Sequence, residues 1–302
     1  MLRVRVLGSA AGGGFPQWNC AAPASRRARA GDSAAPARTQ TSLAVSADGE
    51  RWVLLNASPD LRQQIGATPA LHPNPASGMA RHSPIAAVVL TGAEIDTIAG
   101  LLSLREGHAF ALYAGAGTLA VLAANPVFSV LPPERVPRRT LPPAGSLMLQ
   151  DAGGTALGMA LEVFPVPGKP PLFDAGAGEE TIGLALGAGA ARLFFIPGCA
   201  AMPPDLAARL RNADCVMFDG TLWRDDELAE AVPGGRTGRQ MGHMSLSGPA
   251  GTLAAFASLG VRRRILIHLN TTNPVLLADS PERHVVEQAG WGVAEDGMEF
   301  TL

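Results

Sequence analysis

Two carboxylates stand two residues apart where an apolar segment gives way to a helical pattern. Glu94 and Asp96 follow the apolar run of residues 88–90, and apolar residues recur at helical spacing from Thr97. Carboxylates on a short polar loop can bind a metal cation or hold a proton. Glu94 and Asp96 would equally suit the N-terminus of a helix, where the macrodipole favours negative charge. The residues alone leave both interpretations open.

Further polar residues follow other apolar segments of the chain. They are Asn56, Lys169, Cys199, Asp219, His243, His268 and Asn270. In layered α/β folds the ends of strands form the crevice in which ligands bind, so this recurrence predicts a pocket. Imidazole and carboxylate groups are metal ligands, although a histidine such as His268 can also be a buried structural residue. Cys199 and Cys215 fit buried small side chains better than nucleophiles.

Apolar periodicity and turn residues predict strands and helices in alternation. Strands are expected up to Gly8 and at residues 42–46, 52–56, 192–196, 215–218, 264–269 and 298–302. Helices are expected from Ser58 and over residues 97–106, 204–212, 247–259 and 280–289. Residues 107–180 are rich in Pro and Gly, which indicates short strands with long connections. The alternation implies an α/β fold with helices packed on sheet faces.

Composition limits the classes of protein that the chain can represent. With 302 residues, 47% of them hydrophobic, the chain can bury a sizeable core, and we expect a single domain over residues 1–302. A formal charge of −2 gives no basic surface for nucleic acid. The three cysteines have no close spacing, and no apolar run has signal-peptide or membrane-span length, so we expect a cytoplasmic protein without a membrane span.

Two local features of the composition carry expectations of their own. The Ala- and Arg-rich stretch at about residues 21–38 is expected to be a flexible loop. Lys169 is the single lysine in a chain with 23 arginines, since Lys and Arg together number 24. A lone lysine suggests a position that needs a compact ammonium group, although chance retention explains it equally well.

The loop after residue 90 resembles the Thr-His-x-His-x-Asp-His motif of the metallo-β-lactamase superfamily. Thr91 and Asp96 match the motif, whereas Gly92, Glu94 and Thr97 stand where its three histidines would be. The resemblance implies a four-layer αβ/βα sandwich with a metal pocket at one edge between two β-sheets. It also implies that the site is retained with altered chemistry.

The order of the remaining polar residues resembles the ribonuclease Z-like branch of that superfamily. In this comparison Asn56 occupies the position of the first-motif Asp, and Lys169 that of a His in a Pro-Gly-His loop. Cys199 occupies the position of the Asp that bridges the two metal ions. Asp219, His243 and His268 keep residue types that can be ligands. The resemblance therefore implies a broken dinuclear zinc set, which argues against the two-metal hydrolysis that is usual in the superfamily.

Longer segments resemble one family within this superfamily, the B proteins of pyrroloquinoline quinone (PQQ) biosynthesis. The matching segments are residues 6–20, 56–60, 95–107, 219–223, 237–243 and 267–274. Relatives have further cysteines after Cys20 that bind a structural zinc ion, but Ala22 and Ser25 stand in that run here. We therefore expect this chain to lack that zinc site.

The family resemblance implies iron- and oxygen-dependent hydroxylation of the tyrosine in a Glu-Tyr unit derived from a precursor peptide. It implies Glu94, Asp96, His243 and His268 as ligands of Fe(II), for which zinc can substitute. Asp96, Asp219 and Lys169 are the expected catalytic residues, and Asp219 and Asn270 the residues that orient ligands.

The resemblance also implies partners and leaves two other functions open. The expected partners are a peptide-derived small-molecule substrate and other proteins of PQQ biosynthesis, and a homodimer is compatible with the sequence. One alternative is a carrier that binds PQQ or its precursor for transport toward the periplasm. The other is a zinc hydrolase, which Gly92, Thr97 and Lys169 disfavour.

Overall fold

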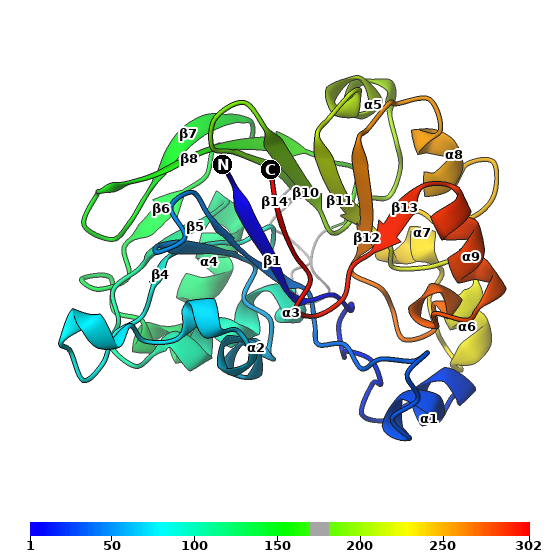
Figure 1. Cartoon of the computed structure of the whole chain (residues 1–302), viewed down its shortest axis with the longest axis horizontal. Helices are drawn as coiled ribbons and strands as arrows, with labels where there is room; N and C mark the ends of the chain where they lie inside the picture. Colours follow the sequence, from blue (N-terminus) through cyan, green and yellow to red (C-terminus); the bar gives the residue numbers. More distant parts are fainter. Residues whose placement is uncertain (170–180) are drawn as a thin grey trace.

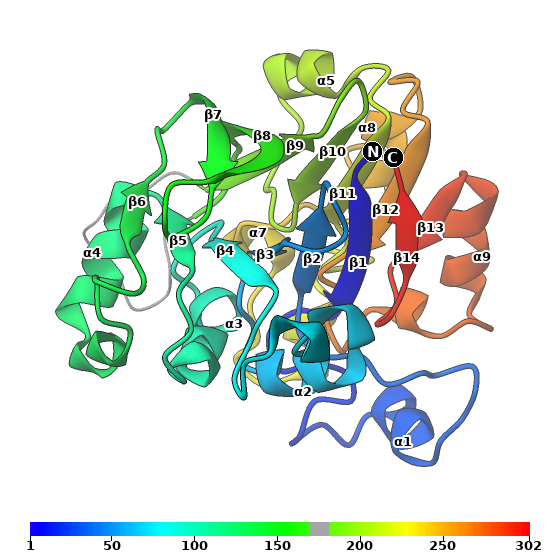
Figure 2. The same cartoon turned by 60° about the vertical axis from the view of Figure 1, so that its left-hand side comes forward.

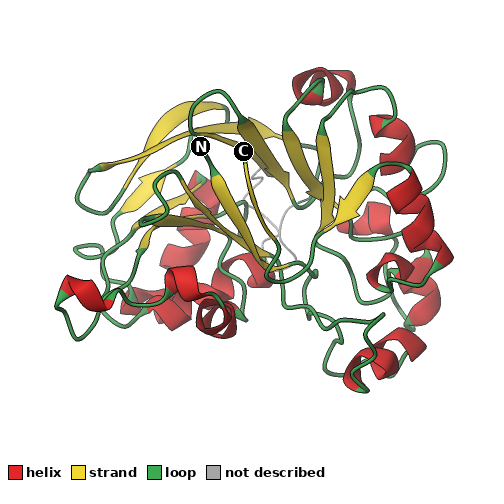
Figure 3. Ribbon diagram, viewed as in Figure 1, coloured by secondary structure: helices red, strands yellow, loops and turns green. Residues whose placement is uncertain are grey.

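The fold consists of two stacked β-sheets with helices on both outer faces (Figures 1 and 3). The computed structural model describes residues 1–169 and 181–302. Each of the two sheets has seven strands. The termini lie close together at one end of the stack, where the last strand pairs with the first (Figure 2). This arrangement is the four-layer αβ/βα sandwich that the sequence predicted.

The strands of each sheet follow a simple spatial order. The first sheet contains, from edge to edge, β14 (Glu299–Thr301), β1 (Arg3–Gly8), β2 (Ser42–Ser46), β3 (Trp52–Leu55), β4 (Ile85–Val89), β5 (Ala111–Ala114) and β6 (Arg138–Thr140). The second contains β13 (Trp291–Val293), β12 (Arg263–Ile267), β11 (Cys215–Asp219), β10 (Arg192–Ile196), β9 (Ile182–Gly187), β8 (Ala156–Pro165) and β7 (Gly145–Gln150). Strands β3 to β6 are mutually parallel, and so are β10 to β13.

Short helices connect these strands and cover the sheets. They are α1 (Pro23–Arg29), α2 (Leu61–Ala67), α3 (Ile95–Ile98), α4 (Ala116–Ala124), α5 (Pro204–Leu210), α6 (Glu227–Ala231), α7 (Gly238–Met241), α8 (Thr252–Phe256) and α9 (Pro281–Gln288). Short 3₁₀ helices lie at Pro69–Leu71, Pro75–Ser77, Ala99–Leu104, Pro126–Val130 and Pro274–Leu276. Within the described ranges, no helix has the length and apolar character needed to cross a membrane.

Three apolar layers hold the four structural layers together. The central layer joins the sheets, with Val53 and Tyr113 from the first sheet and Leu184 and Met217 from the second. Two further clusters pack each sheet against its own helices. Strand β3 is buried on both faces, which explains its continuous apolar sequence. Such a layered core fixes the positions of the strand ends, where the polar residues lie.

Residues 107–169 differ in part from the short strands expected for residues 107–180. The Ala-rich segment Ala116–Ala124 forms helix α4, because alanine and leucine favour helix strongly. Strand β8 is ten residues long, and its side chains alternate between exposed and buried over most of its length. The rest of that expectation, at residues 170–180, lies outside the described residues.

The helix expected over residues 97–106 begins two residues earlier and changes from an α-helix to a tighter 3₁₀ helix. It starts as α3 at Ile95 and continues as a 3₁₀ turn through Leu104. A Cβ atom at Gly100 would lie 2.1 Å from the carbonyl oxygen of Ser58, so the turn packs directly on the backbone of that segment. Helix α8 is likewise shorter than the predicted residues 247–259.

The Ala- and Arg-rich stretch expected as a loop contains helix α1. Arg27 forms ion pairs with Asp32 (2.6 Å) and Asp279 (2.7 Å). The hydroxyl of Ser25 lies 3.3 Å from that of Thr271. These contacts tie the stretch to distant parts of the chain, so the prediction of a loop was wrong for residues 23–29.

Candidate metal centre

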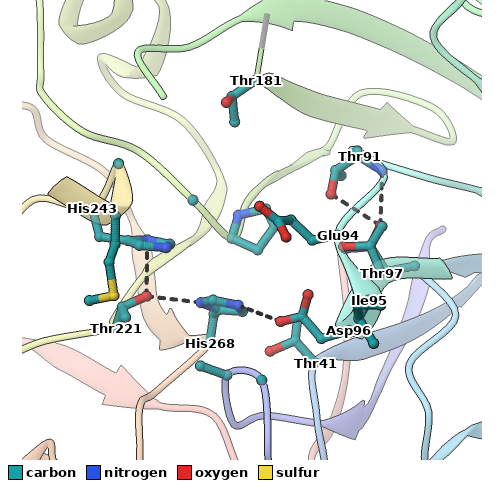
Figure 4. Close-up of a pocket in the computed structure, with 18 of the residues that line it drawn as sticks. Thr41, Thr91, Glu94, Ile95, Asp96, Thr97, Thr181, Thr221, His243 and His268 are labelled. Atoms are coloured by element: carbon teal, nitrogen blue, oxygen red, sulfur yellow. Dashed lines mark hydrogen bonds and ion pairs between the residues drawn. The ribbon is translucent and has the colours of Figure 1, made fainter. Parts of the chain in front are cut away.

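The polar residues predicted from strand ends gather around one cavity. Strand β4 leads into the loop of Glu94 and Asp96, while β11 ends at Asp219 and β12 leads to His268. Parallel strands place their carboxyl ends at the same edge of a sheet, and here the edges of both sheets meet. The cavity has a volume of about 530 Å³ and is lined by Glu94, Asp96, His243 and His268 among others (Figure 4).

Asp96 and His268 face each other across the seam between the sheets. The distance from Asp96 Oδ2 to His268 Nε2 is 3.1 Å, although the residues are 172 positions apart in the chain. His268 has a left-handed backbone with φ of 62°, a conformation that is uncommon outside glycine. Such strain persists only where surrounding structure enforces it. The fold therefore fixes the backbone from which this imidazole faces the carboxylate.

Asp219 is fully buried and uses both carboxylate oxygens as acceptors. Oδ2 accepts from the backbone N–H of Cys199 (2.8 Å) and contacts Nδ1 of His243 (2.7 Å). Oδ1 accepts from the N–H (3.0 Å) and the hydroxyl (2.6 Å) of Thr221. Asp219, His243 and His268 offer ligand atoms within 4.8 Å of one another. Both oxygens of Asp219 are thus engaged by protein donors, an arrangement that suits a carboxylate that orients a histidine.

Electrostatics in this cluster favour charged carboxylates and a protonated imidazole when no metal is bound. Burial alone would raise the pKa of Asp96, but the hydrogen bond and charge of His268 outweigh it and lower the pKa. Burial likewise opposes ionisation of Asp219, yet the charge and hydrogen bond of His243 lower its pKa. Burial opposes the charge on His268, but the contact with Asp96 raises its pKa. The site is therefore built to hold positive charge.

The spacing of Asp96 and His268 fits two ligands of a single ion. Two atoms bound to one ion at about 2.0–2.2 Å and at about 90–110° lie roughly 2.8–3.6 Å apart, and the observed 3.1 Å falls in that range. His243 uses Nδ1 for Asp219, which leaves Nε2 as its available ligand atom. Figure 4 shows the side chain of Glu94 extending into the same cavity. Nitrogen and oxygen donors of this kind can bind zinc or iron.

Two other predicted site residues line the cavity without contacting this cluster directly. Lys169 belongs to the wall next to helix α7, since a Cβ atom at Gly242 would lie 2.9 Å from Lys169 Cγ. Asn270 also lines the cavity, but its side chain donates to the hydroxyl of Thr272 (2.7 Å), which donates to buried Glu227 (2.9 Å). The structure thus brings Lys169 to the cavity wall and ties Asn270 to Thr272 and Glu227.

Cys199 supports the centre through its backbone. Its side chain is buried, and burial raises the pKa of the thiol to about 12. The thiol contacts the carbonyl oxygen of Ala201 (3.0 Å), whereas the backbone N–H holds Asp219. This environment agrees with the buried, unreactive cysteine that the sequence suggested.

Asn56 supports the loop that carries the two carboxylates. Its Oδ1 accepts from the N–H (2.9 Å) and the hydroxyl (3.1 Å) of Thr91. Like His268, Asn56 has a left-handed backbone, with φ of 63°. Asparagine tolerates this conformation better than most residues.

Sequence reasoning missed Thr221 and Arg236, which also line the cavity. Thr221 could have been found from its place two residues after Asp219 on the same strand end. Arg236 lies in a polar loop ahead of α7, where no pattern marks it.

Comparisons with known proteins agree with this fold. A family model described as the beta-lactamase superfamily domain matches residues 51–269. A crystal structure of a diphosphatase from the PhnP family superposes with a TM-score of 0.67 at 19% identity, covering 100% of this chain and 98% of that one, which shows the fold alone.

Full-length relatives are much more similar. Coenzyme PQQ synthesis protein B from Gluconacetobacter diazotrophicus is 55% identical over 309 residues, which is 100% of both chains. The protein of the same name from Xanthomonas campestris pv. campestris is also 55% identical, with the same coverage. The crystal structure of Zn(2+)-bound PqqB from Methylobacterium extorquens has 47% identity and a TM-score of 0.92, covering 99% of this chain and 100% of that one. The chain therefore belongs to the coenzyme PQQ synthesis protein B family of the β-lactamase superfamily.

Proposed function

We propose that this protein acts in the synthesis of coenzyme PQQ as a metal-dependent enzyme. The names of its full-length relatives support the pathway, and the zinc in the Methylobacterium extorquens protein supports a metal. The observation that carries the proposal is the pair of Asp96 Oδ2 and His268 Nε2, held 3.1 Å apart in a cavity. A buried site that favours positive charge and opens onto a ligand-sized space suits metal catalysis.

Asp96 and His268 hold the metal in this proposal, and His243 and Glu94 complete the set. Asp219 orients His243, as carboxylates next to metal-bound histidines commonly do. A mixed set of nitrogen and oxygen donors with open positions suits Fe(II), for which zinc can substitute. Bound Fe(II) would supply the activation of dioxygen.

The proposed reaction is hydroxylation of the tyrosine ring in a Glu-Tyr unit derived from a precursor peptide. Dioxygen and two electrons from a reductant are consumed with two protons, one oxygen atom entering the ring as hydroxyl and the other leaving as water. The cavity offers Ile95, Ile182 and Met241 as apolar surface for the ring. This wall would also exclude water from the reacting carbon.

Cationic side chains of the cavity fit the carboxylates of such a substrate. The ammonium of Lys169 and the guanidinium of Arg236 both line it. Charge-assisted hydrogen bonds from these groups would place the substrate relative to Asp96 and His268. The hydrogen-bonded pair of Asp219 and His243 can hold a proton at the edge of the cavity (2.7 Å).

The experiment uses protein purified without oxygen, loaded with iron, and supplied with dioxygen, ascorbate and a Glu-Tyr dipeptide. Mass spectrometry should detect the hydroxylated dipeptide with the native protein and none with Asp96→Asn, which keeps the shape of the side chain. Asp205→Asn, in exposed α5, is the matched control and should keep activity.

Other outcomes would assign the alternative functions. An unchanged dipeptide together with tight binding of PQQ would contradict the enzymatic proposal and favour a carrier. Cleavage of a phosphodiester by the zinc-loaded protein would favour a hydrolase.

A further inference from the structure

The hydroxyl of Thr221 contacts three members of the candidate centre at once. Its Oγ1 lies 2.6 Å from Asp219 Oδ1, 2.9 Å from His268 Nδ1 and 3.1 Å from His243 Nδ1. Figure 4 shows Thr221 below His243 and beside His268, with a contact drawn to each ring. The two rings stack with centroids 5.3 Å apart, and Thr221 is 4% exposed. One hydroxyl therefore joins both imidazoles to a buried carboxylate.

The direction of these hydrogen bonds follows from a count of protons. A threonine hydroxyl carries one proton, and an ionised carboxylate can only accept. If the proton of Thr221 pointed at an imidazole, two acceptor oxygens would face each other at 2.6 Å with no proton between them. Thr221 must therefore donate to Asp219 and accept from the imidazoles. His268 then carries a proton on Nδ1.

We infer that Thr221 is a positioning residue that holds a proton on Nδ1 of His268, so that the proton displaced by a binding metal is the one that Nε2 shares with Asp96. For His243 the shorter contact to Asp219, 2.7 Å, selects the same form, with Thr221 as a second acceptor. Neutral imidazole has one N–H and one lone pair, so holding the proton on Nδ1 leaves Nε2 for a metal.

This inference rests on the proposed function, because it matters only if His268 binds a metal. Without the hydroxyl, neutral His268 would be free to carry its proton on Nε2, where the carboxylate of Asp96 would accept it at 3.1 Å. That form has no lone pair directed at the metal position. Thr221 disfavours this competing form by accepting from Nδ1.

Two substitutions separate the hydroxyl from the shape of the side chain. Thr221→Val keeps the branched shape and removes the hydroxyl, whereas Thr221→Ser keeps the hydroxyl and removes the methyl group. Zinc affinity of the full chain, measured by competition with a chromophoric chelator, should fall about 10- to 100-fold in Thr221→Val, as for other residues that orient metal-bound histidines. In Thr221→Ser it should stay within about threefold of the native value.

A spectroscopic readout tests the tautomer itself. In zinc-loaded native protein, long-range ¹H–¹⁵N correlation should show Nδ1 of His268 protonated and Nε2 bound to the metal. This measurement needs no variant, so it decides the question even if Thr221→Val does not fold. Thermal unfolding of both variants shows whether a loss of zinc affinity arises from a loss of folded protein.

The outcomes distinguish this inference from the proposal on which it rests. Zinc bound through Nδ1 of His268, or equal affinity in Thr221→Val and native protein, overturns the role of Thr221 and leaves the metal site intact. Failure of the native protein to bind zinc overturns both. Loss of affinity in Thr221→Val, rescue in Thr221→Ser and an Nδ1–H signal support the inference.

Discussion

Asp96 Oδ2 and His268 Nε2 lie 3.1 Å apart, and the two residues come from opposite sheets of the sandwich. Asp96 follows β4 of the first sheet, whereas His268 follows β12 of the second. The central apolar layer between the sheets sets their separation. The geometry of the pair therefore depends on the packing of the whole molecule.

Removing either member of this pair should abolish tight metal binding. We expect Asp96→Asn and His268→Ala each to lower zinc affinity by more than about 100-fold, because loss of a ligand should exceed the 10- to 100-fold typical of a supporting residue. Chelator competition and metal analysis of the purified variants measure the effect. His284→Ala, in helix α9 outside the cavity, is the control and should bind zinc normally. Retained zinc in both site variants would mean that the metal lies elsewhere.

The contribution of this pair to the stability of metal-free protein should depend on pH. Contact with Asp96 raises the pKa of His268, so the stabilisation is complete below the unfolded value of about 6.5 and is lost as pH rises through the folded value. The lowered pKa of Asp96 makes its share present above about 3.9 and lost at lower pH. Urea unfolding in EDTA should therefore show a larger difference between native protein and Asp96→Asn at pH 5.5 than at pH 9. A difference that grows with pH would contradict the pairing.

Asn56 should contribute to stability through Thr91. Asn56→Ala leaves the buried N–H of Thr91 without its acceptor and places alanine in a left-handed backbone, so the free energy of unfolding should fall by about 2–4 kcal/mol. Asn212 has a similar backbone, with φ of 57°, and Asn212→Ala measures the backbone cost alone, about 1–2 kcal/mol. Chemical denaturation compares the two. Equal losses would show that the contact with Thr91 adds nothing.

The three cysteines should differ sharply in reactivity. Burial raises the pKa of the Cys199 and Cys215 thiols to about 12, so neither should react at pH 8 in folded protein. Partial burial opposes ionisation of Cys20, but hydrogen bonds to Ser25 and Ala22 outweigh it and lower its pKa. A thiol-reactive dye should therefore label one cysteine rapidly in native protein and all three after unfolding. Cys20→Ser should abolish the rapid phase.

Strands were predicted well where both faces are buried or where turn residues mark their ends. The predicted strand at residues 192–196 coincides with β10, and the one at 42–46 coincides with β2. Helix α4 was missed, because its composition of alanine, leucine and valine has no strong amphipathic pattern, and its neighbourhood of Pro and Gly suggested loops. Periodicity detects a face that is buried, and this helix buries only part of its surface.

The gathering of polar strand ends could be predicted because topology brings parallel strands to a common edge. The individual roles of these residues could not be predicted from the sequence. Whether Asp219 binds an ion or orients a histidine depends on its bonds to Cys199 and His243, which lie 20 and 24 positions away in the chain, so no local pattern encodes them. The same holds for Thr221, a common residue whose importance comes from its three contacts. Spacing along the chain predicts a pocket, whereas contacts in the folded structure determine which atoms are free to bind a metal and which orient its ligands.

The pairing of β1 with β14 has a consequence for the order of folding during synthesis. Residues 3–5 leave the ribosome long before their partners, residues 299–301. One edge of the first sheet must therefore stay open, with unpaired N–H and C=O groups, until nearly three hundred further residues have been translated. We expect nascent chains that lack residues 299–301 to depend on chaperones that shield exposed strands, and to aggregate without them.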